Sequence, residues 1–258
     1  MTRLISDEVI LDVRDVRRTF GGVIALGGVS LQVPRGNITG LIGPNGSGKT
    51  TLVNIISGML RPTSGTVRLK GHDISGMPAH KIARMGLART FQVVRPFANM
   101  TVLENVAVGA MFGGANRRSA SEAMEVAGAV LQKVGLEARA DAPAEELPIM
   151  DRKRLELARA LASKPEVLLL DEVLAGLRAG ELEEAIALVR SVSETGVTIV
   201  IIEHVLRVIV SLCDEVVVIN RGRKIAEGPP AAVMRNQAVI DAYLGHRAAT
   251  RHSGAADA

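Results

Sequence analysis

The sequence has a single cysteine and very few aromatic residues, and both shortages exclude classes of protein. Cys213 has no second cysteine to pair with, so the chain is not a disulfide-stapled scaffold, and it fits a reducing compartment. The aromatic residues are four Phe and one Tyr, with no Trp. A stacking platform for single-stranded nucleic acid needs several exposed rings. We therefore expect no nucleic-acid partner, and a core of aliphatic side chains in which Cys213 is buried.

Long apolar runs are missing as well. The most apolar stretches, such as residues 197–202, are far too short to cross a bilayer. Residues 1–14 contain three carboxylates and no uninterrupted apolar segment, which argues against a secretory signal. Hydrophobic residues make up 47% and charged residues 22%, a balance that excludes a disordered chain. The formal net charge of +4 is a small excess, which we interpret as a solvated surface.

Apolar periodicity predicts strands that alternate with helices, which is typical of a largely parallel α/β sheet. The segment from about 95 to 160 differs, because it has little clustering of β-branched residues and is rich in Ala, Glu, Leu and Arg. We interpret that segment as a helical insertion. The expected strands cover 9–13, 29–33, 37–43, 67–70, 167–170, 197–202, 216–219 and 224–226, and the expected helices 50–60, 123–134, 152–163 and 181–193.

The strongest chemical signal is a glycine-rich loop between an apolar run and a helical stripe. The segment 43–50, Gly-Pro-Asn-Gly-Ser-Gly-Lys-Thr, matches a phosphate-binding loop. Its glycines let backbone N–H groups wrap around a β-phosphate, Lys49 would neutralise the β- and γ-phosphates, and the Thr50 hydroxyl would ligate Mg²⁺. We therefore expect ATP and Mg²⁺ as cofactors. The expected nucleotide ligands are Gly43, Asn45, Gly46, Ser47, Gly48, Lys49, Thr50 and Thr51.

Two adjacent carboxylates, Asp171 and Glu172, follow the apolar run 167–170. Taken alone, this pattern fits a core strand with a polar cap equally well. Together with the phosphate loop, it predicts that Asp171 coordinates Mg²⁺ and that Glu172 is the catalytic carboxylate that polarises the attacking water.

With these motifs the sequence resembles the ATPase subunits of ABC transporters over roughly residues 7–245. Gln92, in Arg89-Thr90-Phe91-Gln92, matches the glutamine loop of the family, and His204 matches its switch histidine. The resemblance implies that Gln92 senses Mg²⁺ and the permease, and that His204 contacts the γ-phosphate. Phe20 stands 23 residues before Gly43, where the family has a ring that stacks on adenine. A core position would also explain Phe20.

The resemblance implies an α/β fold: a RecA-like P-loop NTPase core, an antiparallel β subdomain and an inserted helical subdomain. The core would comprise residues 7–94 and 161–245, the helical subdomain about 95–160, and residues 246–258 a flexible tail. Several segments look like the larger ATPase subunit of branched-chain amino acid importers: Phe-Gly-Gly-Val at 20–23, Met-Thr-Val-Leu-Glu-Asn-Val at 100–106 and Ala-Tyr-Leu-Gly at 242–245.

That subfamily implies a peripheral subunit on the cytoplasmic face of the inner membrane. Its partners would be a second ABC ATPase subunit, two membrane permeases and, indirectly, a substrate-binding protein. The permease would dock near Gln92, for which Val94, Arg95, Pro96 and Phe97 are candidates. Alternatives remain open: an exporting ABC ATPase, or a nucleotide-gated regulatory module with weak hydrolysis.

One segment departs from the family. Residues 147–151, Leu-Pro-Ile-Met-Asp, stand where the family has a Leu-Ser-x-Gly-Gln signature that reaches a partner's γ-phosphate. Pro148 has neither a hydroxyl nor an N–H, Met150 is bulky, and Asp151 is anionic. We therefore expect an asymmetric heterodimer, in which this chain's phosphate loop and the partner's signature form the competent site. A backbone shift that rescues the contact is the alternative.

Overall fold

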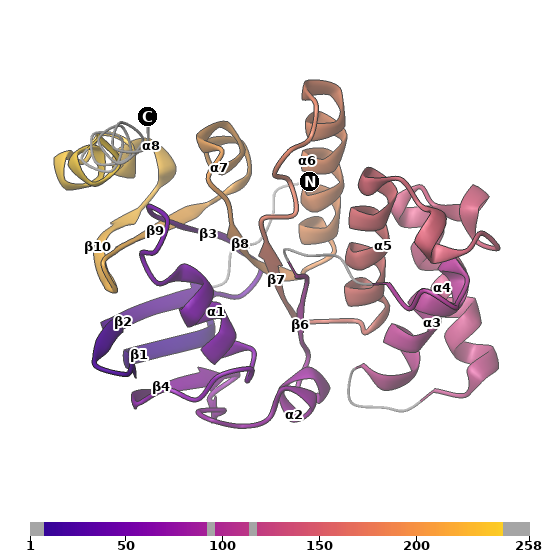
Figure 1. Ribbon diagram of the computed structural model, residues 1–258, viewed down its shortest axis with the longest axis horizontal. Coiled ribbons are helices and arrows are strands. Elements are labelled where there is room, and N and C mark those ends of the chain that lie inside the picture. Colours follow the sequence, from indigo (N-terminus) through magenta and orange to yellow (C-terminus); the bar gives the residue numbers. More distant parts are fainter. Residues whose placement is uncertain (1–7, 92–95, 114–117, 245–258) are drawn as a thin grey trace, which may run out of the picture. The chain divides into compact units, whose positions relative to one another are not determined.

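The computed structural model describes residues 8–91, 96–113 and 118–244 (Figure 1). Within these ranges the chain forms two compact units, and each is considered by itself. The first unit lies within residues 77–199, and the second within 5–76 and 200–258. None of the helices in the described ranges combines the length and the hydrophobicity that a bilayer-crossing helix requires.

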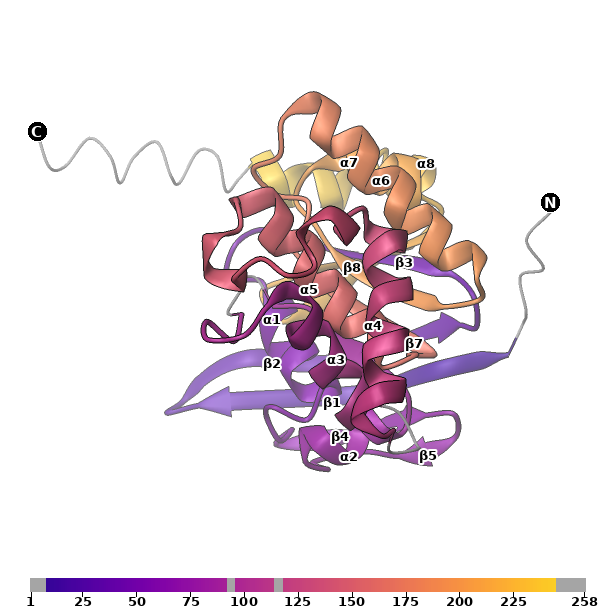
Figure 2. The same ribbon diagram turned by 90° about the vertical axis from the view of Figure 1, so that its right-hand side faces the viewer.

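The second unit contains a four-stranded antiparallel sheet of order β2-β1-β4-β5, whose strands are labelled in Figure 2. Its first two strands extend beyond the predicted segments 9–13 and 29–33. Gly21 and Gly22 take φ angles of 47° and 89° and close a hairpin, so that the strands pair along most of their length. This sheet confirms the antiparallel β part of the expected fold. The strands are β1 (Val9–Phe20), β2 (Val23–Pro34), β4 (Ser64–Leu69) and β5 (His72–Asp73).

The same unit holds three further strands. The fully buried β3 (Ile38–Ile42) runs parallel to β9 (Glu215–Asn220), which turns at Arg221 and Gly222 into the antiparallel β10 (Arg223–Gly228). The helices of this unit are α1 (Lys49–Ile56), α7 (Leu206–Leu212), α8 (Pro230–Val233) and a last helical segment over 237–244.

Helix α1 ends earlier than the predicted residue 60. The Ser57 hydroxyl donates to the carbonyl of Val53 at 2.8 Å, and Gly58 turns the chain with a φ of 73°. The apolar residues after Ser57 therefore continue the pattern in the sequence without continuing the helix.

The first unit contains a parallel strand pair, β6 (Leu87–Arg89) and β7 (Val167–Asp171), in which Arg89 lies opposite Leu169. Helices α2 (Ala79–Arg84) and α6 (Ala179–Glu194) belong to it, and β8 (Thr198–Ile202) begins within it. Neither α2 nor β6 was predicted, because six and three residues are too short to show a period.

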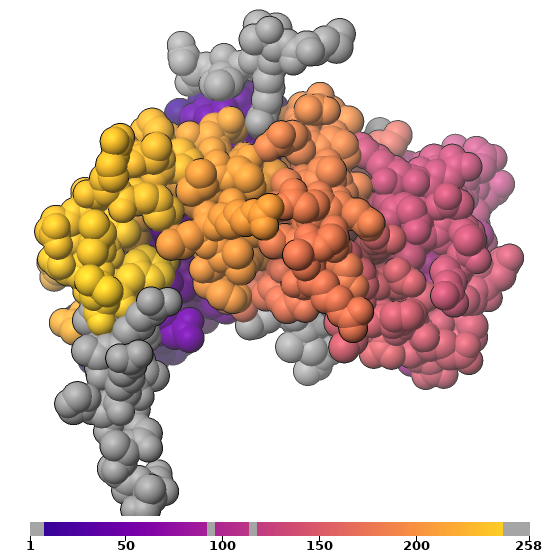
Figure 3. Space-filling view, turned by 90° about the horizontal axis from the view of Figure 1, so that it is seen from above, coloured from indigo at the N-terminus to yellow at the C-terminus, as the bar shows by residue number. Residues whose placement is uncertain are grey.

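Three helices between β6 and β7 pack on one another: α3 (Val102–Phe112), α4 (Ala120–Val134) and α5 (Ile149–Ala162) (Figure 2). Their side chains form one continuous surface, magenta to salmon in the space-filling view (Figure 3). Capping boxes start α3 and α4, and Gly135 ends α4 at a φ of 69°. Two short 3₁₀ turns, Glu137–Arg139 and Ala144–Glu146, connect α4 to α5.

Close contact between α3 and α5 depends on glycine. A Cβ atom at Gly109 would lie 2.3 Å from the Arg159 carbonyl oxygen, and one at Gly113 would lie 2.1 Å from the Ser163 Cβ. The predicted helical insertion is therefore a packed group of helices whose position is fixed by backbone contact. The division of the chain at 95 and 160 into core and helical subdomain stays a prediction, as does the 7–245 boundary. The predicted tail lies outside the described residues.

Candidate nucleotide-binding site

The glycine-rich loop joins β3 to α1, and other backbone segments of the second unit hold it in place. A Cβ atom at Gly43 would lie 1.9 Å from the Ile219 carbonyl oxygen, where only a hydrogen fits. The Gly222 N–H donates to the Ser47 carbonyl at 2.8 Å. Gly48, at a φ of 107°, precedes the first residue of α1 and has no room for a side chain beside the Ala25 carbonyl. The loop therefore has one fixed course over the start of the helix.

Lys49 lies inside this loop. Its Nζ donates to the carbonyl oxygens of Gly43 at 2.8 Å and Pro44 at 3.0 Å, and only 8% of the residue is exposed. In α1, no side chain caps the start, and the first turn contains no acidic residue. A buried ammonium group and the N-terminal amides of a helix together favour an anion.

The predicted ligands differ in exposure. Asn45, Gly46 and Thr50 are exposed, Gly48 and Thr51 are half-buried, and Gly43 and Ser47 are buried. The surface of the loop thus presents polar and glycine positions, while its buried residues anchor it. This is the arrangement expected where backbone amides wrap around a phosphate.

Phe20 and His204 also belong to the second unit. Phe20 ends β1 with 45% of its surface exposed, and the Arg18 guanidinium lies 4.5 Å from its ring centroid. Phe20 is therefore not a core residue, although its role toward adenine stays a prediction. His204 is exposed and lies two residues after β8.

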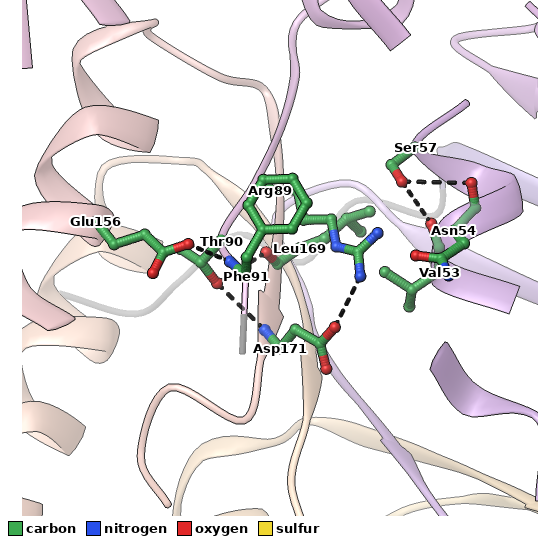
Figure 4. Close-up of polar contacts among 9 residues, drawn as sticks. All are labelled: Val53, Asn54, Ser57, Arg89, Thr90, Phe91, Glu156, Leu169 and Asp171. Atoms are coloured by element: carbon green, nitrogen blue, oxygen red, sulfur yellow. Dashed lines mark hydrogen bonds and ion pairs between the residues drawn. The ribbon is translucent and has the colours of Figure 1, made fainter. Parts of the chain in front are cut away.

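The two carboxylates lie at the end of β7 in the first unit. Asp171 is buried, with 3% exposed, and one of its carboxylate oxygens lies 2.8 Å from an Arg89 guanidinium nitrogen (Figure 4). Glu172 is half-buried and has a φ of 52°, a left-handed backbone conformation that is costly for a residue with a side chain. Strain of this kind concentrates at functional sites.

A polar cluster surrounds Asp171. The Asp171 N–H donates to the Thr90 hydroxyl at 3.2 Å, and the Phe91 N–H donates to the Glu156 carboxylate of α5 (Figure 4). Burial raises the pKa of Glu156, while the Phe91 N–H and the charges of Arg159 and Arg89 act in the opposite direction. This cluster ties the end of β7 to both β6 and α5.

The residues present fit a nucleotide with a divalent cation. Asp171 is a buried carboxylate that already lies against a positive charge, so a cation is chemically suited to this place. The described ranges contain no group of three His, Cys, Asp or Glu side chains that could hold a metal ion by itself. The buried carboxylate of Asp171 suits Mg²⁺, which is usually bound by one or two carboxylates, phosphates and water.

Sequence reasoning missed two residues near these motifs. Arg89 was quoted only as part of a motif, and its pairing with Asp171 depends on the register between β6 and β7. Tyr243 was used only as a subfamily mark, yet its environment includes the phosphate loop: burial raises the pKa of its hydroxyl, and the Gly43 N–H lowers it.

Burial also raises the pKa of Cys213 to about 12, so that thiol is an inert core group.

Some predicted residues lie outside the described residues. Gln92, Val94 and Arg95 are among them. Of the other docking candidates, Phe97 is 43% exposed, and its ring lies 4.5 Å from the Arg159 guanidinium of α5.

The departing segment 147–151 forms the start of α5. Pro148 is the N-cap residue, α5 receives no side-chain cap there, and Asp151 lies in its first turn. The Arg152 guanidinium donates to the Leu147 carbonyl at 2.7 Å. Met150 lines an apolar pocket between α5, the loop after Glu172 and α6, with Lys153, Arg154, Leu157, Val173, Leu174, Leu177, Ala185, Leu188 and Val189.

A phosphate loop between a buried strand and a helix, together with a carboxylate at the end of another buried strand, defines a P-loop nucleotide-binding ATPase. Comparison with known proteins gives the family. The model of the family "ABC transporter" matches residues 26–175, and that of "Branched-chain amino acid ATP-binding cassette transporter" matches residues 223–249. The chain belongs to the ABC transporter family.

Individual relatives agree with this assignment. The chain is 42% identical to the high-affinity branched-chain amino acid transport ATP-binding protein BraF of Pseudomonas aeruginosa, over 92% of this chain and 98% of that protein. A nucleotide-free ATP-binding cassette from an ABC transporter superposes with a TM-score of 0.83 at 32% identity, covering 92% and 99% of the two chains. A dimeric cassette bound to ADP and Pi gives a TM-score of 0.77 at 25% identity, covering 85% and 98%. The expected fold class and ATPase activity are confirmed.

Proposed function

We propose that this chain is the ATP-driven motor subunit of an importer for branched-chain amino acids or related small polar solutes. It would act on the cytoplasmic face of the membrane, with two permease subunits, a second ABC ATPase subunit and, indirectly, a substrate-binding protein. The observation that carries the proposal is the match of residues 223–249 to the branched-chain amino acid family model, in the same unit as a fixed phosphate loop. The relative from Pseudomonas aeruginosa supports the same substrate class.

The residues have distinct roles in this proposal. Lys49 and the backbone amides of the loop hold the phosphates, and Phe20 packs on adenine. Bound Mg²⁺ would supply positive charge to the β- and γ-phosphates, with Thr50, Gln92 and Asp171 as its protein contacts. Glu172 orients the attacking water and accepts its proton, and His204 contacts the γ-phosphate.

We further propose that the chain works in an asymmetric heterodimer. The observation that favours this is the start of α5, where Pro148 stands at the N-cap and Asp151 in the first turn. A proline offers no N–H, and a carboxylate beside the helix N-terminus opposes a phosphate. This chain's loop and the partner's signature form the competent site, and the opposite site hydrolyses ATP weakly.

The second candidate is an ABC ATPase with a regulatory or exporting role. The same start of α5 favours weak hydrolysis at one site, which suits a subunit whose output is closure of the dimer. The two candidates differ in their partners, because an importer assembles with a substrate-binding protein.

A pull-down from solubilised membranes of the native host tests the importer proposal. We expect the tagged chain to co-purify with two permeases and a second ATPase whose signature is intact. The same pull-down with Phe97→Glu tests the proposed docking residues. Phe97 is 43% exposed, and a charge there should reduce recovery of the permeases. Recovery of the chain with no membrane partner would overturn the transporter proposal.

A further inference from the structure

Arg89 and Asp171 form a buried ion pair between the ends of β6 and β7. The guanidinium and carboxylate lie 2.8 Å apart, and the side chains are only 7% and 5% exposed. A carboxylate buried to this extent is strongly disfavoured unless a cation or several donors compensate its charge. Within the first unit, Arg89 is a cation that compensates the charge of Asp171. Asp171 is also the carboxylate that the proposed function names as a metal contact.

The register of the strands fixes Arg89 in this place. Arg89 lies opposite Leu169 in the parallel pair, and the Thr90 N–H donates to the Leu169 carbonyl at 2.9 Å. The Asp171 N–H donates in turn to the Thr90 hydroxyl at 3.2 Å. Arg89 therefore reaches Asp171 from a backbone that is hydrogen-bonded to the same strand.

The Arg89 guanidinium also has a second neighbour. It lies 5.0 Å from the centroid of the Phe91 ring, within the range of a cation–π interaction (Figure 4). If the carboxylate turned to a stronger cation, this ring would still stabilise the guanidinium. Phe91 is itself held through its N–H by Glu156 of α5.

We propose that Arg89 is the resident counter-cation of Asp171 and that the metal of the bound nucleotide competes with it. Before the nucleotide binds, Arg89 pairs with the carboxylate at 2.8 Å and fixes its direction. With a metal bound, Asp171 would be free to contact the metal, and Arg89 would keep its contact with Phe91. This inference rests on the proposed function, because it takes Asp171 as a metal contact. Arg89 is thus a positioning residue that sets how strongly nucleotide binding depends on the metal.

The exchange predicts a specific change in Arg89→Gln. Glutamine removes the charge that competes with the metal but keeps hydrogen-bonding capacity. The melting temperature without nucleotide should fall, because Asp171 loses its buried partner. The ratio of the ADP dissociation constants measured with EDTA and with Mg²⁺ should rise about tenfold, the size of a modest charge-pair coupling. Arg89→Lys keeps the charge and should leave the ratio near that of the natural chain.

Arg154→Gln is the matched control. Arg154 pairs with Glu184 at 2.7 Å in the same unit, but these side chains are 25% and 69% exposed. An exposed pair contributes little to stability, and this one does not involve Asp171. The control should therefore change neither the metal ratio nor the melting temperature appreciably.

The measurement is isothermal titration of the full chain with ADP, in Mg²⁺ and in EDTA, alongside thermal unfolding without nucleotide. A ratio that does not change in Arg89→Gln, with binding weakened equally in both buffers, means a purely structural role and overturns the inference. A natural chain whose ADP affinity ignores Mg²⁺ contradicts the metal assignment of the proposed function instead.

A double-mutant cycle gives a second test if Arg89→Gln folds but is too unstable for the titration. Asp171→Asn alone should lower the melting temperature, because it leaves the Arg89 charge buried without its carboxylate. The combination with Arg89→Gln should recover much of that loss if the two side chains form one coupled pair. Strictly additive losses would show that the pair is not coupled and would overturn the inference.

Discussion

Two loop-to-helix junctions in this chain, one at α1 and one at α5, have opposite chemistry. The α1 junction begins at Gly48, has no acidic residue in its first turn and includes the buried ammonium group of Lys49. The α5 junction begins at Pro148 and has Asp151 in its first turn. A helix N-terminus attracts anions only when its amides are accessible and no carboxylate competes for them. The comparison teaches that the α1 junction suits an anion better than the α5 junction does.

The largest expected effect comes from Lys49→Ala, which removes the cation from the α1 junction. Hydrolysis should fall by about 10²–10³-fold, the usual effect of losing one preorganised donor to a developing charge. The affinity for ATP should also fall, because the hydrogen bonds from Lys49 Nζ to the loop carbonyls are lost with the charge. Steady-state phosphate release and ATP titration check this result.

Lys133→Ala is the control for the Lys49 prediction. Lys133 is an exposed residue in the last turn of α4, and its loss should leave both measurements unchanged. If Lys49→Ala hydrolysed ATP as fast as the natural chain, the α1 junction would not be the phosphate site.

A smaller effect is expected from Gly109→Ala, which tests how firmly α5 is held. The new Cβ would lie 2.3 Å from the Arg159 carbonyl, so α3 and α5 must separate. Overpacking of this kind costs about 1–3 kcal/mol. The melting temperature should therefore drop by several degrees, which calorimetry can measure.

Gly128→Ala is the matched control, because it makes the same change in helix α4, where the new Cβ has open space: among the described residues, no atom beyond its chain neighbours and the helix's own backbone lies within 4 Å. Alanine should stabilise that helix by about 0.5–1 kcal/mol. Opposite signs for the two variants would show that α5 is fixed by backbone contact. Equal melting temperatures would contradict that. They would mean that α5 can shift, so that its start could still reach the partner's γ-phosphate.

Much of the site could be predicted from the sequence because its motifs are local. The phosphate loop follows directly from glycines, a lysine and a threonine at fixed spacing, and Asp171 and Glu172 follow an apolar run. The exposure of Phe20 could not be predicted, since a strand end can point to the core or to solvent. The partner of Asp171 could not either, because Arg89 reaches it through a three-residue strand that shows no period.

The helical region shows the same division. The composition of residues 95–160 predicted helices, and the predicted helix end at residue 134 is confirmed by the end of α4. The roles of Gly109 and Gly113 were not predictable, because nothing in their local sequence shows that another helix passes within contact distance. Contacts between helices that are far apart in the sequence require glycine at these positions. Periodicity in a single sequence shows local structure but not such contacts.

Changing the start of α5 gives the smallest expected effect. It is also the most direct test of the proposed difference between the two ATP sites of the heterodimer. A rapid-quench measurement should count the ADP formed per heterodimer in the first turnover, with the two permeases present. We expect one ADP per heterodimer from the natural chain, and up to about a doubling for Pro148→Ser with Met150→Gly, because the second site gains its γ-phosphate contact. A natural heterodimer that forms two ADP in the first turnover, or a double variant that leaves the count unchanged, would contradict the account.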